Sequence, residues 1–477
     1  MGKRFIDRTE ELKTLENEYK RSETSFVIIY GRRRVGKTAL ISEFLSRHEC
    51  CRLYYLATQE PEGQNRRAFR DQVAEMTGND LLKTADADWL TIFKYLAEYP
   101  SDKRKIIVLD EFQYLSGTAP AFPSVMQKIW DTVLKNANVM LILCGSLVTL
   151  MKQQTMDYSS PLYGRRTAQI CLKQIPFAYY RDFYAGKSEE ELIMYYAVTG
   201  GVPKYIETFR DAKSVEEGME RDILNPQSYL YEEPYFLLQN ELSEIGSYFS
   251  LIRAIAMGNR KLSDIAAYLG VKQTNLPKYL KTLTDLDLVE REVPVTENNP
   301  EKSKKGLYRI TDNYIAFWFR FVYPYRAFLE RGETQYVMGQ IRKTFLQNYV
   351  SFIYEDICRE KMWEYAAKGL IGFRFDRLGR YWGPVCGEVD VLGLDIPGGN
   401  IVLGECKYTE SEKGLSVLHD LKEKAAALEK TTGCRCRSYV IFSTAGFTRG
   451  LLEEAETNPE ILLADILTPV KRGLLIV

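Results

Sequence analysis

The sequence has few histidines, no closely spaced cysteine motif and no long hydrophobic run. Only 2 of its 477 residues are histidine, which argues against a histidine-based metal centre or a serine–histidine–aspartate triad. The nine cysteines form no Cys-x-x-Cys ladder, so a zinc site is not expected, and reduced cysteines suit the cytoplasm. The longest apolar run, residues 139–144, is too short to span a bilayer, and the N-terminus lacks a signal-peptide apolar region. We therefore expect a cytoplasmic protein with no membrane partner.

The chain also has no excess of charge of either sign. Lysine plus arginine and aspartate plus glutamate number 64 each, so the formal net charge is zero. A globally basic nucleic-acid-binding protein is not indicated, and any DNA-binding surface must be a local patch. The hydrophobic fraction of 45% and the charged fraction of 27% are typical of a globular protein. The length alone predicts roughly two to four domains.

A glycine-rich loop near the N-terminus follows an apolar strand and precedes a helix. The apolar strand covers residues 26–30, and the loop has the Walker A spacing G-x-x-x-x-G-K-T. Glycines let the backbone approach phosphate oxygens, and free amides at the helix start point at the anion. Lys37 would reach the β- and γ-phosphates, and Thr38 would offer its hydroxyl to Mg2+. The predicted nucleotide-binding residues are Gly31, Arg32, Arg33, Arg34, Val35, Gly36, Lys37, Thr38 and Asp110.

Two further apolar strands predict the rest of an ATPase core. Residues 105–109 precede Asp110 and Glu111, the pattern of a Walker B strand. Asp110 would hold the Mg2+ shell, and Glu111 would activate the attacking water as general base. Residues 139–144 form the third strand, and Ser146 after it either senses the γ-phosphate or caps a helix. Strands that alternate with helices predict β-α-β units around one parallel sheet.

Arg165 and Arg166 follow a short polar segment and are candidates for an arginine finger. A guanidinium group stabilises the charge on a transferring phosphoryl group. The alternative is a surface arginine or one that contacts DNA. A finger that acts in trans would require a homo-oligomer, and a finger in cis would not.

Several segments together resemble the archaeal ATPase family of the broad AAA+/STAND-like group. They are F-I-D-R-T-E-E-L at 5–12, the arginine-rich phosphate loop, L-D-E-F-Q at 109–113, P-L-Y-G-R at 161–165 and G-G-V-P at 200–203. The resemblance implies an ATPase core over residues 1–180 and a helical lid over residues 181–245. It makes Arg165 the first finger candidate and Arg166 the second, and it implies that residues 5–12 lie near the adenine.

The middle of the chain has the pattern of a winged helix-turn-helix, over residues 246–330. Gly270 permits the turn between two amphipathic helices, and Pro277 is tolerated only in the first turn of the second helix. Strands predicted at 288–295 and 307–311 flank a polar, lysine-containing wing. Helix-turn-helix geometry would bring the following polar residues near a DNA groove: Lys272, Gln273, Lys278 and Lys281. Packing of this domain against protein is the alternative.

Residues 340–477 have the pattern of a nuclease domain. A strand with Asp390 and a strand with Glu405 and Lys407 are joined by a Pro-Gly-Gly turn. Two carboxylates close together form a site for Mg2+, and Lys407 can orient water on the same face as Glu405. Glu355, in a helical stretch upstream, would complete the site. These residues resemble the PD-(D/E)xK fold, and the archaeal ATPase family includes members with a C-terminal domain of unknown function that carries this pattern.

We therefore expect an α/β protein with a P-loop parallel-sheet ATPase domain, a helical lid, a winged helix and a restriction-endonuclease-like α/β domain. The predicted function is that of an ATP-binding, Mg2+-dependent ATPase that binds or processes DNA, with a C-terminal endonuclease activity. The alternative is a STAND-like nucleotide-controlled switch with an inert nuclease-like domain. The predicted catalytic residues are Glu111, Arg165, Arg166, Ser146 and Lys407, and the predicted metal ligands are Thr38, Asp110, Glu355, Asp390 and Glu405.

Overall fold

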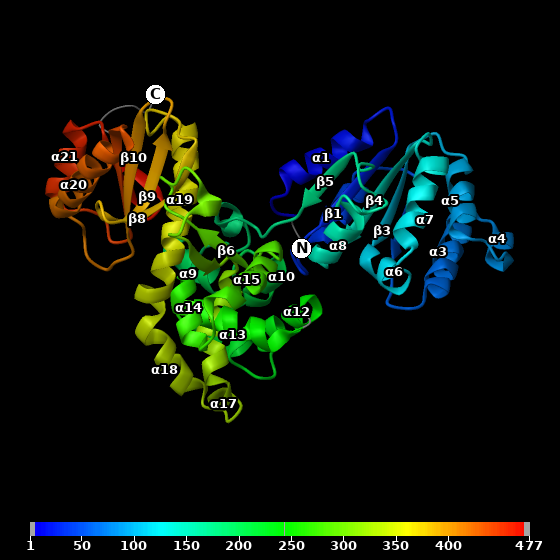
Figure 1. Ribbon diagram of the computed structural model, residues 1–477, viewed down its shortest axis with the longest axis horizontal. Helices are drawn as coiled ribbons and strands as arrows, with labels where there is room; N and C mark the ends of the chain where they lie inside the picture. The colour runs from blue at the N-terminus through cyan, green and yellow to red at the C-terminus, as the bar shows by residue number, and fades with distance from the viewer. Residues whose placement is uncertain (1–4, 243, 472–477) are drawn as a thin grey trace. The chain divides into compact units, whose positions relative to one another are not determined.

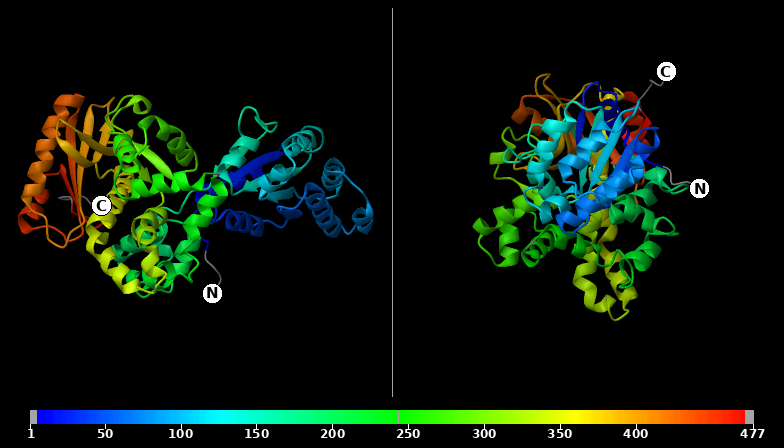
Figure 2. Two further views of the ribbon diagram at one scale, coloured as in Figure 1. Left: turned by 60° about the horizontal axis from the view of Figure 1, so that its bottom comes forward. Right: turned by 90° about the vertical axis from the view of Figure 1, so that its right-hand side faces the viewer.

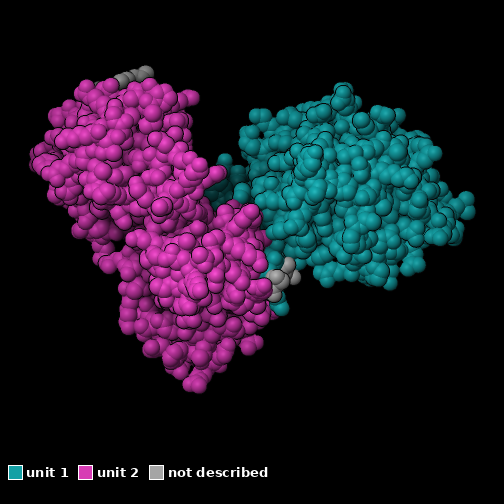
Figure 3. All heavy atoms as spheres, in the orientation of Figure 1, with its two compact units in different colours: residues 1–179, 201–207, 237–243 teal, residues 180–200, 208–236, 244–477 magenta. Residues whose placement is uncertain are grey.

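A computed structural model describes residues 5–242 and 244–471 and divides the chain into two compact units, coloured separately in Figure 3. Unit 1 comprises residues 1–179, 201–207 and 237–243, and unit 2 comprises residues 180–200, 208–236 and 244–477. The segment 181–245, which we expected to form one lid, is therefore shared between the units. The winged helix and the C-terminal sheet fall within the same unit.

Unit 1 contains a fully parallel sheet with the strand order β2-β3-β4-β1-β5 (Figure 1). Its strands are β1 (Ser25–Tyr30), β2 (Arg52–Leu56), β3 (Lys105–Asp110), β4 (Val139–Gly145) and β5 (Ala168–Cys171). Every residue of β1, β3 and β4 is buried, as expected for parallel strands covered on both faces. Strand β4 lies between the Walker A strand β1 and the Walker B strand β3, so its carboxyl end adjoins both motifs.

Helices of unit 1 cover the two faces of this sheet with two apolar cores (Figure 2). Because side chains alternate along a strand, Phe26 and Ile28 enter one core, and Val27 and Ile29 enter the other. The helices are α1 (Thr9–Tyr19), α2 (Lys37–Ser46), α3 (Glu62–Thr77), α4 (Asp80–Thr84), α5 (Trp89–Glu98), α6 (Phe112–Thr118), α7 (Phe122–Ile129), η1 (Trp130–Leu134) and α8 (Val148–Thr155). Three helices have residues in both units: η2 (Phe177–Asp182), α10 (Pro203–Phe209) and α12 (Glu233–Glu241).

The helical part of unit 2 surrounds a buried aromatic core. The indole of Trp318 donates to the carbonyl of Tyr231 at 2.6 Å, and the Tyr314 hydroxyl donates to the carbonyl of Leu230. Both aromatic side chains are buried and belong to this core. The helices are α9 (Glu189–Thr199), α11 (Val215–Gly218), η3 (Met219–Ile223), α13 (Ile245–Ala256), α14 (Leu262–Leu269), η4 (Gln273–Asn275), α15 (Leu276–Asp285), η5 (Pro300–Lys302), α16 (Asn313–Phe317), η6 (Trp318–Val322), η7 (Tyr323–Tyr325), α17 (Arg326–Leu329), α18 (Thr334–Phe345) and η8 (Leu346–Val350).

The winged-helix hairpin is shorter than we expected. Strands β6 (Val289–Glu292) and β7 (Leu307–Ile310) pair antiparallel, whereas the first strand was predicted to continue to residue 295. Pro294 has no N–H to donate to a ladder, and the N–H of Val295 donates instead to the carbonyl of Arg380 at 2.9 Å. The segment after β6 is therefore hydrogen-bonded to strand β8 (Arg377–Gly383) of the C-terminal sheet.

The C-terminal part of unit 2 is a mixed sheet with the order β13-β12-β11-β10-β9-β8. Its elements are α19 (Ser351–Ala367), β8 (Arg377–Gly383), β9 (Gly387–Asp395), β10 (Asn400–Lys407), α20 (Leu415–Thr432), β11 (Arg435–Ser443), α21 (Arg449–Thr457), β12 (Ile461–Asp465) and β13 (Thr468–Lys471). Strands β8, β9 and β10 are antiparallel, and β10, β11 and β12 are parallel. Helix α20 packs on one face, where Leu403 is buried, and α19 packs on the other, where Tyr365 stacks on Phe442.

Candidate functional site

The Walker A loop connects β1 to α2 in a conformation that requires glycine at two positions. Gly31 has φ of 154° and Gly36 has φ of 98°, and a Cβ on Gly31 would lie 2.4 Å from the carbonyl oxygen of Leu172. The Lys37 ammonium donates to the carbonyls of Gly31 at 2.8 Å and Arg32 at 3.0 Å. Burial lowers the pKa of Lys37, opposed by nearby acids including Glu111.

The Walker B acid Asp110 ends β3 and faces the start of α2. The hydroxyl of Thr38 lies 3.4 Å from Asp110 Oδ2, and the hydroxyl of Tyr54 donates to the same carboxylate oxygen. Burial and the hydrogen bond to Asp110 raise the pKa of Tyr54, so this tyrosine stays protonated. Mg2+ prefers oxygen ligands, which Thr38 and Asp110 provide. The loop N–H groups and the Lys37 ammonium can donate hydrogen bonds to phosphate oxygens, so these residues fit MgATP.

The side chain of Glu111 is held by two partners. Ser146, just after β4, donates to Glu111 Oε2 at 2.7 Å, and the amide of Gln113 donates to the same oxygen and also to Ser146 Oγ at 3.3 Å. Glu111 has φ of 53°, which is uncommon for a residue other than glycine. The strand order therefore places Ser146 beside the predicted general base, and Gln113 is a third member that motif reading by itself did not assign.

Two more residues near the loop were missed from the sequence. Buried Arg8 donates to the carbonyls of Val35 at 3.2 Å and Lys173 at 2.6 Å, so Arg8 links the phosphate loop to the segment after β5. Burial raises the pKa of Glu241 to about 7, an effect that Arg32 and Arg33 oppose. Glu241 lies about 200 residues from the loop in sequence, and only the fold brings it near.

The two finger candidates differ in their surroundings. Arg165 forms a bidentate pair with Asp131, at 3.0 and 2.8 Å, and also donates to the carbonyl of Pro161 at 2.8 Å. Arg166 lies near Tyr30 at the end of β1. Burial raises the pKa of Tyr30 to about 12, and the positive charge of Arg166 opposes this rise. Within the described ranges, Arg166 makes no ion pair. The finger role of either residue stays a prediction.

The C-terminal candidate residues lie on neighbouring strands. Asp390 of β9 accepts the N–H of Cys406 at 2.9 Å, and Glu405 of β10 pairs with Lys407 at 2.6 Å and with Lys424 of α20 at 3.2 Å. Burial raises the pKa of Asp390, and Glu405 raises it further. A cavity of about 430 Å³ is lined by Glu405, Lys407 and Lys424.

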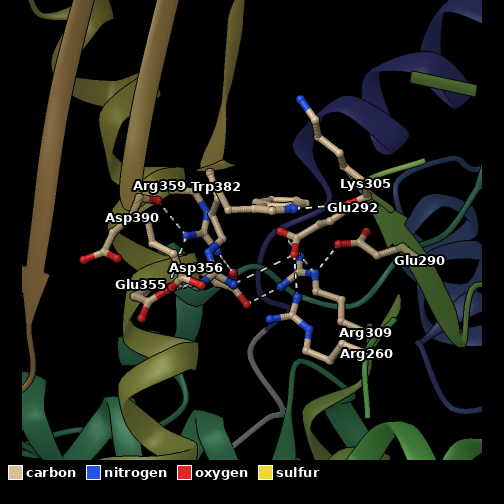
Figure 4. Close-up of polar contacts among 12 residues, drawn as sticks. Arg260, Glu290, Glu292, Lys305, Arg309, Glu355, Asp356, Arg359, Trp382 and Asp390 are labelled. Atoms are coloured by element: carbon tan, nitrogen blue, oxygen red, sulfur yellow. Dashed lines mark hydrogen bonds and ion pairs between the residues drawn. The ribbon is translucent and has the colours of Figure 1, made fainter. Parts of the chain in front are cut away.

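Glu355 lies on α19, close to Asp390. Burial raises the pKa of Glu355 to about 7, and Asp390 raises it further, against Arg380 and Arg359. Figure 4 shows Glu355 and Asp390 beside Arg359, which donates to the Asp390 backbone carbonyl at 3.0 Å. Among the residues that the structure describes, no three His, Cys, Asp or Glu side chains gather to hold a metal. Asp390 and Glu405 are the two acids that strand pairing brings together, and the role of Glu355 as a third metal ligand stays a prediction.

The second helix of the helix-turn-helix presents a basic face. α15 begins after the short helix η4, and Pro277 lies in its first turn, as expected from the sequence. Lys272, Lys278 and Lys281 are exposed, and none of them forms an ion pair with another described residue. This face carries uncompensated positive charge.

No helix within residues 5–242 and 244–471 combines the length and the apolar character needed to cross a bilayer. This finding agrees with the short apolar runs of the sequence.

Comparison with known proteins agrees with this geometry. A model of the ATPase domain predominantly from Archaea matches residues 5–209, and a model of archaeal and bacterial proteins of unknown function matches residues 318–419. A Methanocaldococcus jannaschii protein described as uncharacterized is 35% identical over 393 residues, 82% of this chain and 84% of that protein. An uncharacterized ATP-binding protein of the same organism is 51% identical over 41 residues, 9% of this chain and 70% of that protein.

A solved structure shares the fold. A Walker-type ATPase of Pyrococcus abyssi aligns with a TM-score of 0.51 and 21% identity, over 66% of this chain and 96% of that chain. The Walker loop, the acidic strand end and the parallel sheet define a nucleotide-binding P-loop ATPase of the AAA+-like class. The chain belongs to the archaeal ATPase family with the additional C-terminal region of unknown function.

Proposed function

We propose that this protein is a Mg2+-dependent ATPase that binds DNA through α15 and cleaves DNA at Asp390, Glu405 and Lys407. The observation that carries the proposal is the pairing of β9 with β10 in an α-β-β-β-α-β order. It brings an aspartate beside a glutamate that shares a strand face with a lysine. The three residues have the chemistry of a phosphodiester-cleaving site.

At the P-loop, each side chain has a defined task. Lys37 and the loop amides would hold the phosphates, and Thr38 and Asp110 would hold Mg2+. Bound MgATP would supply the phosphoanhydride bond and the charge that polarises it. Glu111 would accept the proton of the attacking water, oriented by Ser146 and Gln113. The Tyr54 hydroxyl would keep the Asp110 carboxylate directed toward Thr38.

At the C-terminal site, Asp390 and Glu405 would hold Mg2+ and Lys407 would orient a water. Mg2+, when bound, would neutralise charge on the scissile phosphate. Lys407 is already aimed at Glu405, and the pair raises its pKa against the lowering effect of burial, so it stays cationic. Burial raises the pKa of Asp390, and the nearby Glu405 carboxylate raises it further.

DNA binding would begin at the basic face of α15. Its exposed lysines without carboxylate partners can contact phosphates without breaking ion pairs. The double variant Lys278→Ala/Lys281→Ala should weaken binding of any duplex and reduce the salt slope by about two. The double variant Lys343→Ala/Lys430→Ala removes two exposed lysines of the same unit and serves as the control.

The experiment measures ATP hydrolysis with and without single- and double-stranded DNA, and resolves the DNA products on a gel. The variants are Lys37→Ala and Asp390→Asn, with Lys20→Ala and Glu460→Gln as exposed controls. DNA-stimulated turnover with cleavage lost only in Asp390→Asn supports the proposal. Intact DNA in the wild type with Mg2+ present rejects the nuclease part, and turnover that DNA does not change rejects the coupling.

The second candidate function is a nucleotide-controlled switch with an inert C-terminal domain. The observation that favours it is the wing, which is hydrogen-bonded to β8 rather than free to enter a minor groove. The indole of Trp382 also donates to the carbonyl of Lys305 at 3.2 Å. Slow turnover, intact DNA and unchanged elution in the presence of DNA would support the switch.

A further inference from the structure

A cavity of about 260 Å³ lies within unit 2, and its lining residues include neither Asp390 nor Glu405. Residues of α13, the hairpin strand β7, η6 and α19 contribute to its wall. Its volume is near the lower end of small-molecule pockets, which begins at roughly 300 Å³.

The cavity wall carries far more positive than negative charge. Its charged lining residues are Arg260, Arg309, Arg320, Arg359, Arg380 and Asp356. The other acids that pair with these arginines are not among the lining residues; they are Glu290, Glu292, Glu355 and Glu388. Four of the five arginines thus have acid partners, and Arg320 is the lining arginine without one among the described residues, so its side of the cavity attracts an anion.

Two of these arginines are not fully satisfied. Within the part of the chain that the structure describes, Arg320 makes no ion pair or hydrogen bond, and its guanidinium lies only near the Phe321 ring, at 5.5 Å. The Nε of Arg260 is buried without a hydrogen-bond partner, although the other end of that guanidinium reaches Glu292 at 2.6 Å. Burial lowers the pKa of Arg320 and of Arg260. Half-buried cations without enough acceptors are stabilised when an anion binds.

The remaining lining is apolar and aromatic. Tyr308, Tyr349 and Phe352 contribute rings, and Ile255 and Ile310 contribute aliphatic side chains. Phe352 is 49% exposed, although aromatic side chains elsewhere in this unit are mostly buried. An exposed ring beside a guanidinium group suits a flat base next to a phosphate. Figure 4 shows Arg260 and Arg309, from different elements, beside the acids Glu292 and Asp356 with which they pair.

We propose that this cavity binds a nucleoside 5′-monophosphate group, either as the free nucleotide or as the phosphorylated end of a DNA strand. The phosphate would contact Arg320 and Arg260, whose planar guanidinium groups match its oxygens. The base would lie against Phe352. The proposal does not depend on hydrolysis at the P-loop or on cleavage at Asp390.

Calorimetric titration of the full chain tests the proposal. Lys37→Ala is the background, so that the P-loop contributes little to the signal. The probes are dAMP, deoxyadenosine and inorganic phosphate. We expect dAMP to bind, and deoxyadenosine and phosphate each to bind at least about tenfold more weakly, because each lacks one half of the recognised group.

Two variants locate the bound probe. Arg320→Gln should weaken dAMP binding at least about tenfold, and Arg331→Gln, an exposed arginine of the same unit, should not. Phe352→Ala changes an exposed side chain, so folding should be kept; it should weaken dAMP binding several-fold and leave phosphate binding unchanged. Unchanged dAMP affinity in both Arg320→Gln and Phe352→Ala overturns the proposal. Phosphate that binds as tightly as dAMP also overturns it, since the cavity then takes an adventitious ion only.

Blunt duplexes with a 5′-phosphate or a 5′-hydroxyl distinguish the two sources of the ligand. Displacement of dAMP by the phosphorylated duplex alone identifies the strand end as the ligand. Binding of dAMP without such displacement identifies the free nucleotide. If neither dAMP nor the phosphorylated duplex binds, the cavity is not a nucleotide site. ATP hydrolysis and DNA cleavage are measured in separate assays. A cavity that binds no nucleotide would therefore leave the proposed ATPase and nuclease functions unaffected.

Discussion

Arg309 of β7 forms an ion pair with Asp356 of α19, and this pair links the winged-helix hairpin to the C-terminal domain (Figure 4). Asp356 also pairs with Arg359, which contacts the Asp390 backbone at 3.0 Å. Although burial acts to raise the pKa of Asp356, Arg309 and Arg359 hold it below its usual value. Two consecutive salt bridges and one hydrogen bond thus connect the hairpin to β9, the strand that carries Asp390.

Removing Arg309 should destabilise unit 2. Arg309→Gln leaves Asp356 without one of its two cations, at an expected cost of about 2 kcal/mol. That is less than for a fully buried pair, because both side chains keep 31% exposure. The measurement is the midpoint of thermal unfolding. Arg342→Gln is the control, because its pair with Glu216 is 49% and 47% exposed and should contribute less than about 1 kcal/mol. Equal midpoints for the two variants would contradict the prediction.

The residues around Glu111 should affect turnover more than nucleotide binding. Glu111→Gln should lower kcat by about 10²–10⁴ and leave ATP affinity unchanged, because a general base acts in the transition state. Ser146→Ala and Gln113→Leu should each lower kcat about tenfold, since each loosens the Glu111 carboxylate. Steady-state kinetics with separate nucleotide titration measures both quantities. Thr118→Ala, exposed on α6, is the control, and a raised KM with normal kcat would argue against the role.

Glu355 should make stability depend on pH. Its pKa of about 7 in the folded chain exceeds that in the unfolded chain, so the folded state retains a proton that the unfolded state releases. Stability therefore falls as pH rises from about 4.5 to 7. Glu355→Gln mimics the protonated acid, so its advantage over wild type should grow across this window to about 2–3 kcal/mol at pH 8.

Thermal midpoints from pH 4.5 to 8, without added metal, measure this effect. Glu364→Gln on the same helix is the control. The pKa of Glu364 is lowered by Lys361 and Lys368 despite opposing burial, so ionised Glu364 stabilises the fold and that contribution is lost as pH falls. The two variants should therefore show opposite trends with pH. Parallel trends would show that Glu355 is ionised in the folded chain near pH 5.

The pair Arg165 and Asp131 tests the arginine-finger prediction. If Arg165 acts on ATP bound by another copy, Arg165→Ala should lower kcat about 10³-fold. Asp131→Asn releases the guanidinium from its bidentate partner and should keep or raise kcat. The measurement is turnover as a function of protein concentration, because a finger in trans gives specific activity that rises with concentration. Loss of activity in Asp131→Asn equal to that in Arg165→Ala would instead assign the pair to stability.

The sequence by itself determined the parts of this protein whose chemistry is local. The Walker A loop and the acidic strand end are contiguous segments, because phosphate binding needs a particular backbone turn and a lysine at fixed spacing. The continuous apolar strands predicted a parallel sheet covered on both faces, and β1, β3 and β4 are buried throughout. Alternation along β10 likewise predicted that Glu405 and Lys407 share a face, and they are paired at 2.6 Å.

Only the tertiary structure decided which distant side chains share a site. The position of β4 between β1 and β3 brought Ser146 to Glu111, and no local pattern encodes strand order. Glu241 and Arg8 reach the phosphate loop through long-range packing, and helix α19 brings Glu355 close to Asp390 of the sheet. The arginines that line the cavity come from segments far apart in the sequence. Only the fold brings them together, so the charge of the cavity wall could not be predicted from any one segment.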